Sequence, residues 1–294
     1  MTANGALWAD RTHRLVGPRG SLELEISFML PSLFIGHGAP TLALGGSIAA
    51  RFLQGRGPLL ARPKAVLVVS AHWKTERPTV TSDTLNTMIH DYAGFPAALR
   101  DIRYTPPGSP DSARRVVDAL AANAITASAV TGRGLDHGAW VPLSLAFSKA
   151  DIPVLQLSVQ TARGPGHALR IGRALAPLRD DLLIIGSGSL THSLADADLA
   201  TEGTDDEPDF VIEFAAWMHR HLTHGAIADL LDYRERAPFA AKNHPTEEHL
   251  LPLFTALGAA GPEPQVKRLH ASTTHRALRM DAYAFSSNQE EMSL

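Results

Sequence analysis

The chain has 294 residues, of which 45% are hydrophobic and 19% charged, a composition typical of folded globular proteins rather than disordered ones. Its formal net charge of -3 gives no basic surface for nucleic acid, and no apolar run is long enough to cross a membrane. Because cysteine is absent, disulfides, thiolate ligands and a cysteine nucleophile are excluded, and any metal must be held by His, Asp or Glu.

Residues 1–28 carry scattered charges and no apolar segment of signal-peptide type, so we expect no secretory signal and a cytoplasmic protein. Ordered sequence is expected to begin near Met29, and residues 1–28 are interpreted as a disordered or loosely packed extension. No internal repeat or low-complexity linker divides the remainder, which predicts a single domain over residues 29–294.

Short runs rich in Val, Ile and Leu predict strands, most of them apolar throughout, as expected of strands covered on both faces. These runs are Ser32–Ile35, Ala65–Ser70, Pro153–Val159, Leu182–Ile185 and Gln265–Leu269. Helical patterns lie between them at Ser112–Ala122, Gly166–Leu178 and Pro208–Leu222, and a further helix is expected to begin near Val141–Pro142. The alternation predicts one three-layer α/β domain with a central, mostly parallel or mixed sheet and a site at the strand C-terminal ends.

Two long irregular segments interrupt this pattern, at residues 88–110 and 131–140. Loops of such length inside a compact domain are commonly functional, often as covers over a substrate. In the second segment His137 stands between Asp136 and Gly138 at an apparent helix entrance, a position that presents side chains to a cleft.

Histidines follow three of the predicted strands: His37, His72 and, after a Gly-Ser-Gly-Ser stretch, His192. Either of the first two alone is most simply a polar residue ending a strand. Together they favour a metal site, because ligands of open α/β sheets collect beyond the carboxyl ends of the strands. Neutral imidazole suits Fe, Zn, Ni and Cu, and a third ligand is expected from Glu248 or His249.

The pattern leaves the roles of two histidines open. His192 is interpreted first as a general base, with a fourth metal ligand or a hydrogen-bonded loop residue as alternatives. His137 is expected either to hydrogen-bond a substrate or to cap a helix. The remaining histidines are expected to be structural or exposed; in the helix over 208–222, His221 falls in the apolar stripe while His219 points away.

Six short motifs occur in order along the chain: Gly36-His37-Gly38-Ala39-Pro40, Ser70-Ala71-His72-Trp73, Ile89–Pro96, Leu135–Trp140, Ser187–His192 and Pro245–Pro252. Together they resemble the DOPA-dioxygenase-type class III extradiol ring-cleaving dioxygenases, within the catalytic LigB-like superfamily. Ala39 departs from the pattern, since many members carry Ser there.

The resemblance implies a non-haem Fe(II) enzyme in which His37, His72 and His249 bind the metal, with Zn(II) possible in the same site. It matches His192 to an active-site histidine described as acid/base residue or additional metal contact, and His137 to a second histidine lining the substrate pocket. The loop containing Tyr92 is expected to cover the substrate ring. The implied partners are O2 and a small aromatic diol, catechol or DOPA-like, opened to a muconic semialdehyde-type product by a monomer or homodimer.

Two other functions are compatible with the same residues. A zinc-dependent hydrolase could use the same ligands, although the sequence has no HExxH helix and no carboxylate clearly placed as its base. A non-catalytic binding protein of the same fold would not need both His192 and His137.

Overall fold

The computed structural model describes residues 29–56, 62–198 and 206–288, so the extension predicted over residues 1–28 lies outside the described part of the chain. An eight-stranded sheet of order β4-β3-β5-β2-β6-β1-β10-β7 forms the centre of the molecule. Its strands are β1 (Ser32–Gly36), β2 (Ala65–Lys74), β3 (Thr79–Thr81), β4 (Ser128–Val130), β5 (Val154–Val159), β6 (Leu182–Gly188), β7 (Gln265–His270) and β10 (Ala282–Ser286). A separate two-stranded ladder pairs β8 (Thr273–Thr274) with β9 (Leu278–Arg279).

The four central strands β5, β2, β6 and β1 are parallel. On one side β10 pairs antiparallel with β1 and β7 pairs antiparallel with β10, and on the other side β3 pairs antiparallel with β5. This mixed sheet confirms the predicted α/β fold. All five predicted strands are present, and β2 and β6 extend further at their carboxyl ends than their apolar runs indicated.

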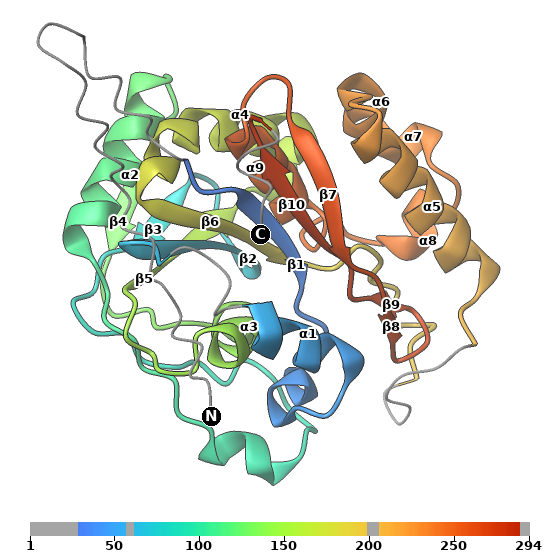
Figure 1. Cartoon of the computed structure of the whole chain (residues 1–294), viewed down its shortest axis with the longest axis horizontal. Helices are drawn as coiled ribbons and strands as arrows, with labels where there is room; N and C mark the ends of the chain where they lie inside the picture. The colour runs from blue at the N-terminus through green and yellow to red at the C-terminus, as the bar shows by residue number, and fades with distance from the viewer. Residues whose placement is uncertain (1–28, 57–61, 199–205, 289–294) are drawn as a thin grey trace, which may run out of the picture.

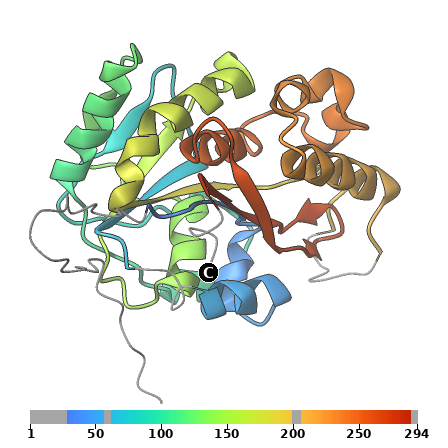
Figure 2. The ribbon, with the colours of Figure 1, turned by 45° about the horizontal axis from the view of Figure 1, so that its top comes forward.

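Helices cover both faces of the sheet, giving three layers (Figures 1 and 2). One face carries α2 (Pro110–Ala122), α4 (Gly164–Leu175) and α9 (Leu251–Ala259), and the other carries α1 (Ile48–Arg56) and α3 (His137–Ala146). Beyond β7 lie α5 (Asp209–Thr223), α6 (Ile227–Leu231), α7 (Tyr233–Arg236) and α8 (Ala240–Asn243). Within the described ranges, every helix falls short of the length and apolarity that a membrane crossing requires.

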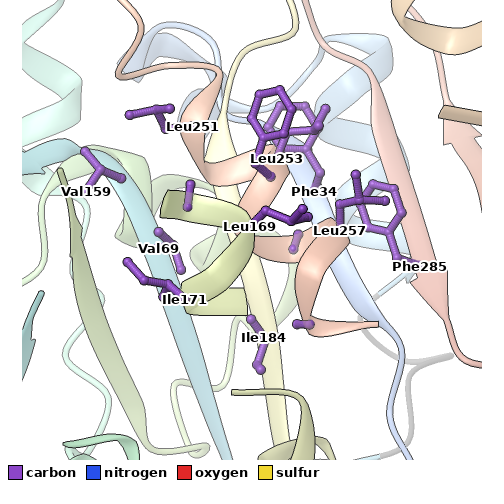
Figure 3. Packing of buried hydrophobic residues seen from close by; sticks show 14 of the residues in the cluster. Phe34, Val69, Val159, Leu169, Ile171, Ile184, Leu251, Leu253, Leu257 and Phe285 are labelled. Atoms are coloured by element: carbon purple, nitrogen blue, oxygen red, sulfur yellow. The ribbon is translucent and has the colours of Figure 1, made fainter. Parts of the chain in front are cut away.

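Each face of the sheet buries its own apolar cluster. On the α4 and α9 side, Phe34, Ile184 and Phe285 of the sheet pack against Leu169 and Leu257 of the helices (Figure 3). On the other side, α3 buries Trp140 and Leu143 against strands β2 and β6. Burial on both faces explains why the central strands are apolar at every position rather than alternating.

Two local expectations were wrong. The helix expected near Val141 begins four residues earlier, at His137, and Pro142 lies inside it instead of in its first turn. The Gly186–Gly188 stretch, interpreted as a loop, is the last part of strand β6. The two differences change the backbone next to His137 and His192, two of the predicted site residues.

Candidate active site

The five predicted histidines come together at the carboxyl ends of the central strands. His37 follows β1, His72 lies near the end of β2, and His192 comes four residues after β6. His137 is the first residue of α3, and His249 lies in the turn before α9. The ring centres of His37, His72 and His249 are 4.9, 4.9 and 5.4 Å apart.

The turn that contains His249 passes close to Gly188, where strand β6 has no side chain. This close approach lets His249 reach the cluster. The backbone N–H of Ser189 donates to the carbonyl of His249 at 2.9 Å, and a Cβ on Gly188 would stand 2.1 Å from that same oxygen. Pro252, in the first turn of α9, fits a position where no backbone N–H is needed. The turn is therefore held against the strand end by its backbone.

The tautomer of His37 is set by hydrogen bonds on the far side of its ring. Its Nδ1 atom lies 2.9 Å from Oγ of Ser187, and that hydroxyl donates to the backbone carbonyl of Gly138. Because Ser187 donates its hydroxyl proton to Gly138, the proton in the bond between Ser187 and His37 must be on Nδ1 of His37. The carbonyl of Gly138 accepts no hydrogen bond from within its helix, because the residue four positions later, Pro142, lacks a backbone N–H. Nε2 of His37 consequently keeps its lone pair.

Asp91 lies between His72 and His137. Its Oδ1 accepts from the backbone N–H of His137 at 3.0 Å and lies 2.9 Å from Nδ1 of that ring, while Oδ2 is 3.7 Å from Nδ1 of His72. Burial acts to raise the pKa of Asp91, but hydrogen bonds from His137 outweigh it and hold the pKa at about 2. An ionised carboxylate only accepts, so protons on both Nδ1 atoms are favoured and both Nε2 atoms keep lone pairs.

The arrangement of His37, His72 and His249 fits one metal ion. Nε2 of His72 lies 3.0 Å from Nε2 of His37 and 3.3 Å from Nε2 of His249. Ligand nitrogens about 2.1 Å from one ion would stand about 3.0–3.4 Å apart, with ring centres about 4.6–5.3 Å apart. The two Nε2 separations and two of the three ring separations fall within these ranges, and the third, 5.4 Å between His37 and His249, lies just above its range.

A second set of three histidines that could hold a metal ion shares two members with this one. Ring nitrogens of His37, His72 and His137 all lie within 4.8 Å of one another. The centre of His137 is, however, only 3.9 Å from that of His72, closer than two ligands of one ion would stand. The group that contains His249 fits a single ion better.

His37, His72 and His249 are neutral at physiological pH. Burial and the neighbouring imidazoles lower the pKa of His37 and His249 well below the usual range. Burial, followed by the charge on His137, lowers the pKa of His72 to about 3. Neutral imidazoles are the form that binds metal ions.

His192 stacks on His249, with ring centres 3.5 Å apart and planes inclined by 9°. Burial is the main cause that lowers its pKa to about 4. Its backbone is fixed by a hydrogen bond from its N–H to the carbonyl of Asn243 at 2.8 Å. The His192 ring thus lies against His249 in its neutral form.

Behind the site, the buried carboxylate of Asp136 does not cap α3 as its position suggests. It accepts from Oγ of Ser70 at 2.7 Å and from Arg133 at 2.9 Å, and it also bonds the amide of Gln156. Oγ of Ser70 in turn accepts from the backbone N–H of His72. This network ties the start of α3 to the end of β2, which fixes His72 and His137 relative to each other.

Tyr92 lies in the predicted covering loop and faces the cluster. Its ring centre is 5.8 Å from that of His137 in an edge-on arrangement, and the ring centre of Phe95 lies 5.6 Å from it. Within the described residues its buried hydroxyl has no hydrogen-bond partner. A polar group of a substrate would supply one.

Two histidines of α5 outside the cluster, His219 and His221, have structural surroundings. His221 stacks on Trp217 at 3.9 Å, as its place in the apolar stripe predicted. His219, expected to point away from the apolar face, instead lies 3.3 Å from the hydroxyl of Tyr283 in β10. The expectation failed because β10 was not recognised, and α5 packs beside that edge of the sheet.

A cavity of about 720 Å³ lies next to the loop that follows His37, between α1 and the β8–β9 ladder. Its walls include Thr41, Ile48, Arg279 and Met280. None of the five clustered histidines lines it, so this cavity is separate from the group that fits a metal.

Comparison with known proteins shows the family of the chain. The family model described as the catalytic LigB subunit of aromatic ring-opening dioxygenase matches residues 49–285. The chain is 41% identical over 265 residues to a 4,5-DOPA dioxygenase extradiol of Beta vulgaris, covering 87% of this chain and 96% of the relative. The chain belongs to the class III extradiol ring-cleaving dioxygenases.

Other relatives extend this family across kingdoms. A 4,5-DOPA dioxygenase extradiol of Escherichia coli K12 is 37% identical over 81% of this chain and 88% of its own length. The crystal structure of an uncharacterized protein from Escherichia coli K12 superposes with a TM-score of 0.73 at 29% identity, covering 87% of this chain and 99% of that one. An extradiol dioxygenase acts on an aromatic compound and O2, and the clustered histidines give this one a metal-binding site.

The sequence analysis missed two residues that shape this site. Asp91 was placed only in a covering loop, although an acid directly before Tyr92 faces the same cleft. Ser187 carried no signal of its own, because its role depends on a carbonyl that Pro142 leaves free in a different segment.

Proposed function

We propose that this dioxygenase inserts O2 into a catechol or DOPA-like vicinal diol, next to the two hydroxyls, and gives a muconic semialdehyde-type product. Fe(II) is the proposed metal, held by His37, His72 and His249. The observation that carries the proposal is the convergence of three imidazoles whose separations fit one ion. The names of the relatives, which specify 4,5-DOPA and extradiol, support the choice of substrate class.

Three ligand rings on one side of an Fe(II) ion would leave its other positions to the reactants. Fe(II) bound there would hold the diol and O2 side by side and stabilise negative charge on the diol oxygens. The chain supplies rings whose lone pairs already face the centre, because Ser187 and Asp91 engage the opposite nitrogens of His37 and His72. Little reorganisation is then needed on binding.

His192 is the proposed general base. It is neutral at physiological pH, since its pKa is about 4, and its ring lies over His249 at the edge of the ligand group. A neutral imidazole there can take the phenolic proton as the diol binds and return it later in the reaction.

His137 and Tyr92 are the proposed substrate contacts. Because Nδ1 of His137 is engaged by Asp91, its Nε2 is left to meet the substrate. The hydroxyl of Tyr92 would donate to a polar substituent on the ring, and its aromatic face would exclude water from the diol.

The deciding experiment is anaerobic reconstitution of the purified chain with Fe(II), followed by addition of catechol or DOPA and then O2. We expect O2 uptake and a coloured ring-opened product, and equal activity from a His224→Ala control, which changes an exposed histidine. Absence of O2 uptake with any diol would refute the proposal. Activity restored only by Zn(II), on an ester or amide, would instead support the hydrolase alternative.

A further inference from the structure

We propose that Asp91 is a positioning residue that holds His72 in its metal-binding tautomer and His137 in its substrate-binding tautomer at the same time. This role rests on the proposed function, in which His72 binds the metal and His137 meets the substrate. The carboxylate acts through the two rings and touches neither metal nor substrate.

The geometry divides the carboxylate between two tasks. Oδ1 meets two donors of His137, the backbone N–H at 3.0 Å and Nδ1 at 2.9 Å. Oδ2 faces Nδ1 of His72 at 3.7 Å, which is too long for a hydrogen bond but close enough for an ionised carboxylate to favour a proton on that nitrogen. The carboxylate therefore favours lone pairs on Nε2 of both rings.

The main chain keeps Asp91 in place independently of its side chain. The N–H of Ile89 donates to the carbonyl of Leu135 at 2.7 Å, and the indole N–H of Trp140 donates to the carbonyl of Ile89 at 3.1 Å. These bonds hold the loop against the start of α3. A change confined to the Asp91 side chain should thus alter the two histidines without releasing the loop.

An amide cannot replace the carboxylate in both tasks, because it has one acceptor atom instead of two. In Asp91→Asn we expect the amide oxygen to stay with His137, where two donors converge. The NH2 group would then face Nδ1 of His72 and favour a lone pair on that atom, leaving the proton on Nε2. The metal would have to displace that proton.

The test uses Co(II) as the metal probe, titrated into metal-free protein and followed by visible absorption. Asp91→Asn and Asp91→Ala are expected to bind Co(II) about 10–100-fold more weakly, the usual loss when a group that orients a ligand histidine is removed. Asp101→Asn, an exposed carboxylate in the neighbouring segment, is the matched control and should bind as the unmodified chain does.

Nitrogen NMR of the Zn(II)-loaded proteins gives a second readout that does not depend on turnover. His137 should remain protonated at Nδ1 in Asp91→Asn and show mixed tautomers in Asp91→Ala. Unchanged Co(II) affinity in Asp91→Asn, or an unchanged His137 signal in Asp91→Ala, would overturn the role. If Asp91→Ala fails to fold, the nearly isosteric Asp91→Asn still decides the first point.

The outcomes also separate this role from the proposed function. An unmodified chain that binds Co(II) but cleaves no diol would remove the proposed function and leave the Asp91 result standing. If the unmodified chain cleaves the diol but Asp91→Asn binds Co(II) normally, the proposed function stands and the role of Asp91 is removed.

Discussion

Nε2 of His37 lies 3.0 Å from Nε2 of His72, and the partners on the far side of each ring turn a lone pair toward this gap. Two lone pairs repel at that separation unless a cation lies between or beside them. Nε2 of His249 faces the same region at 3.3 Å from His72. A metal ion bound to these nitrogens would remove the repulsion between their lone pairs.

Metal retention in single variants should therefore show whether His249 or His137 is the third ligand. We expect His37→Ala, His72→Ala and His249→Ala to lose the metal, because each removes one of three converging nitrogens, whereas His137→Ala should retain it. Metal content per chain after gel filtration measures this directly. Retention by His249→Ala together with loss by His137→Ala would identify His137 as the third ligand.

His192→Ala is expected to keep the metal and lose turnover by about 10²–10⁴-fold, the usual contribution of a positioned acid or base. Its ring stacks on a proposed ligand with ring centres 3.5 Å apart, closer than two ligands of one ion would stand. Single-turnover ring cleavage, measured beside metal content, distinguishes the two effects. Release of the metal by this variant would make His192 a ligand and remove its assignment as base.

Ser187→Ala tests the hydrogen bond that sets the tautomer of His37. Loss of the hydroxyl leaves Nδ1 of His37 without an acceptor, so metal affinity should fall by about 10–100-fold. Ser189→Ala is the control, because that hydroxyl is equally buried but donates to the carbonyl of Thr191. Equal metal affinity in the two variants would show that Ser187 does not orient His37.

The fold could be read from the sequence where one physical signal dominated. Runs such as Val66–Val69 and Leu182–Ile185 are apolar at every position because helices cover both faces of the central strands. Strand β10 (Ala282–Ser286) was missed because two of its five residues are Ala, which strands disfavour, and its pairing with β1 is distant in sequence. Strands β3 and β4, of three residues each, are too short to show a period.

The five site histidines could be found because each follows a strand or begins a helix, where side chains meet. Their hydrogen-bond partners could not. The bond between Ser187 and Gly138 joins segments 49 residues apart, and it depends on the missing N–H of Pro142 in a helix whose start was misplaced. Asp91 acts across a similar distance on His137. Such pairings are set by tertiary packing, which local patterns do not carry.

Gly188→Ala should damage the metal site through the backbone. The new methyl would stand 2.1 Å from the carbonyl of His249, so either β6 or the turn must move, at a cost of about 1–3 kcal/mol. We expect a lower melting temperature and weaker metal binding together. Gly166→Ala, in α4, adds the same methyl into open space, so it should leave metal binding unchanged and should not lower the melting temperature, because alanine favours a helix over glycine. Normal metal affinity in Gly188→Ala would show that His249 tolerates the displacement.

Acid should destabilise the chain through histidines that are buried in neutral form, and His244 isolates this effect. Its ring lies between Phe214 and Tyr233, its Nε2 bonds the carbonyl of Leu190 at 2.9 Å, and burial is the main cause that lowers its pKa to about 4. Between pH 6.5 and 4 the unfolded chain binds a proton that the folded chain does not. Stability therefore falls as pH falls through this range, by about 1.4 kcal/mol per pH unit from this residue.

His244→Gln keeps a donor for the carbonyl of Leu190 but cannot titrate. Its free energy of unfolding, measured with urea at several pH values from 7 to 4.5, should depend on pH less steeply than that of the unmodified chain. The other buried histidines contribute equally to both proteins, so the difference in slope reports His244 alone. His224→Gln, at an exposed position, should leave the slope unchanged. Identical slopes for His244→Gln and the unmodified chain would mean that His244 gains its proton in the folded state as readily as in the unfolded one.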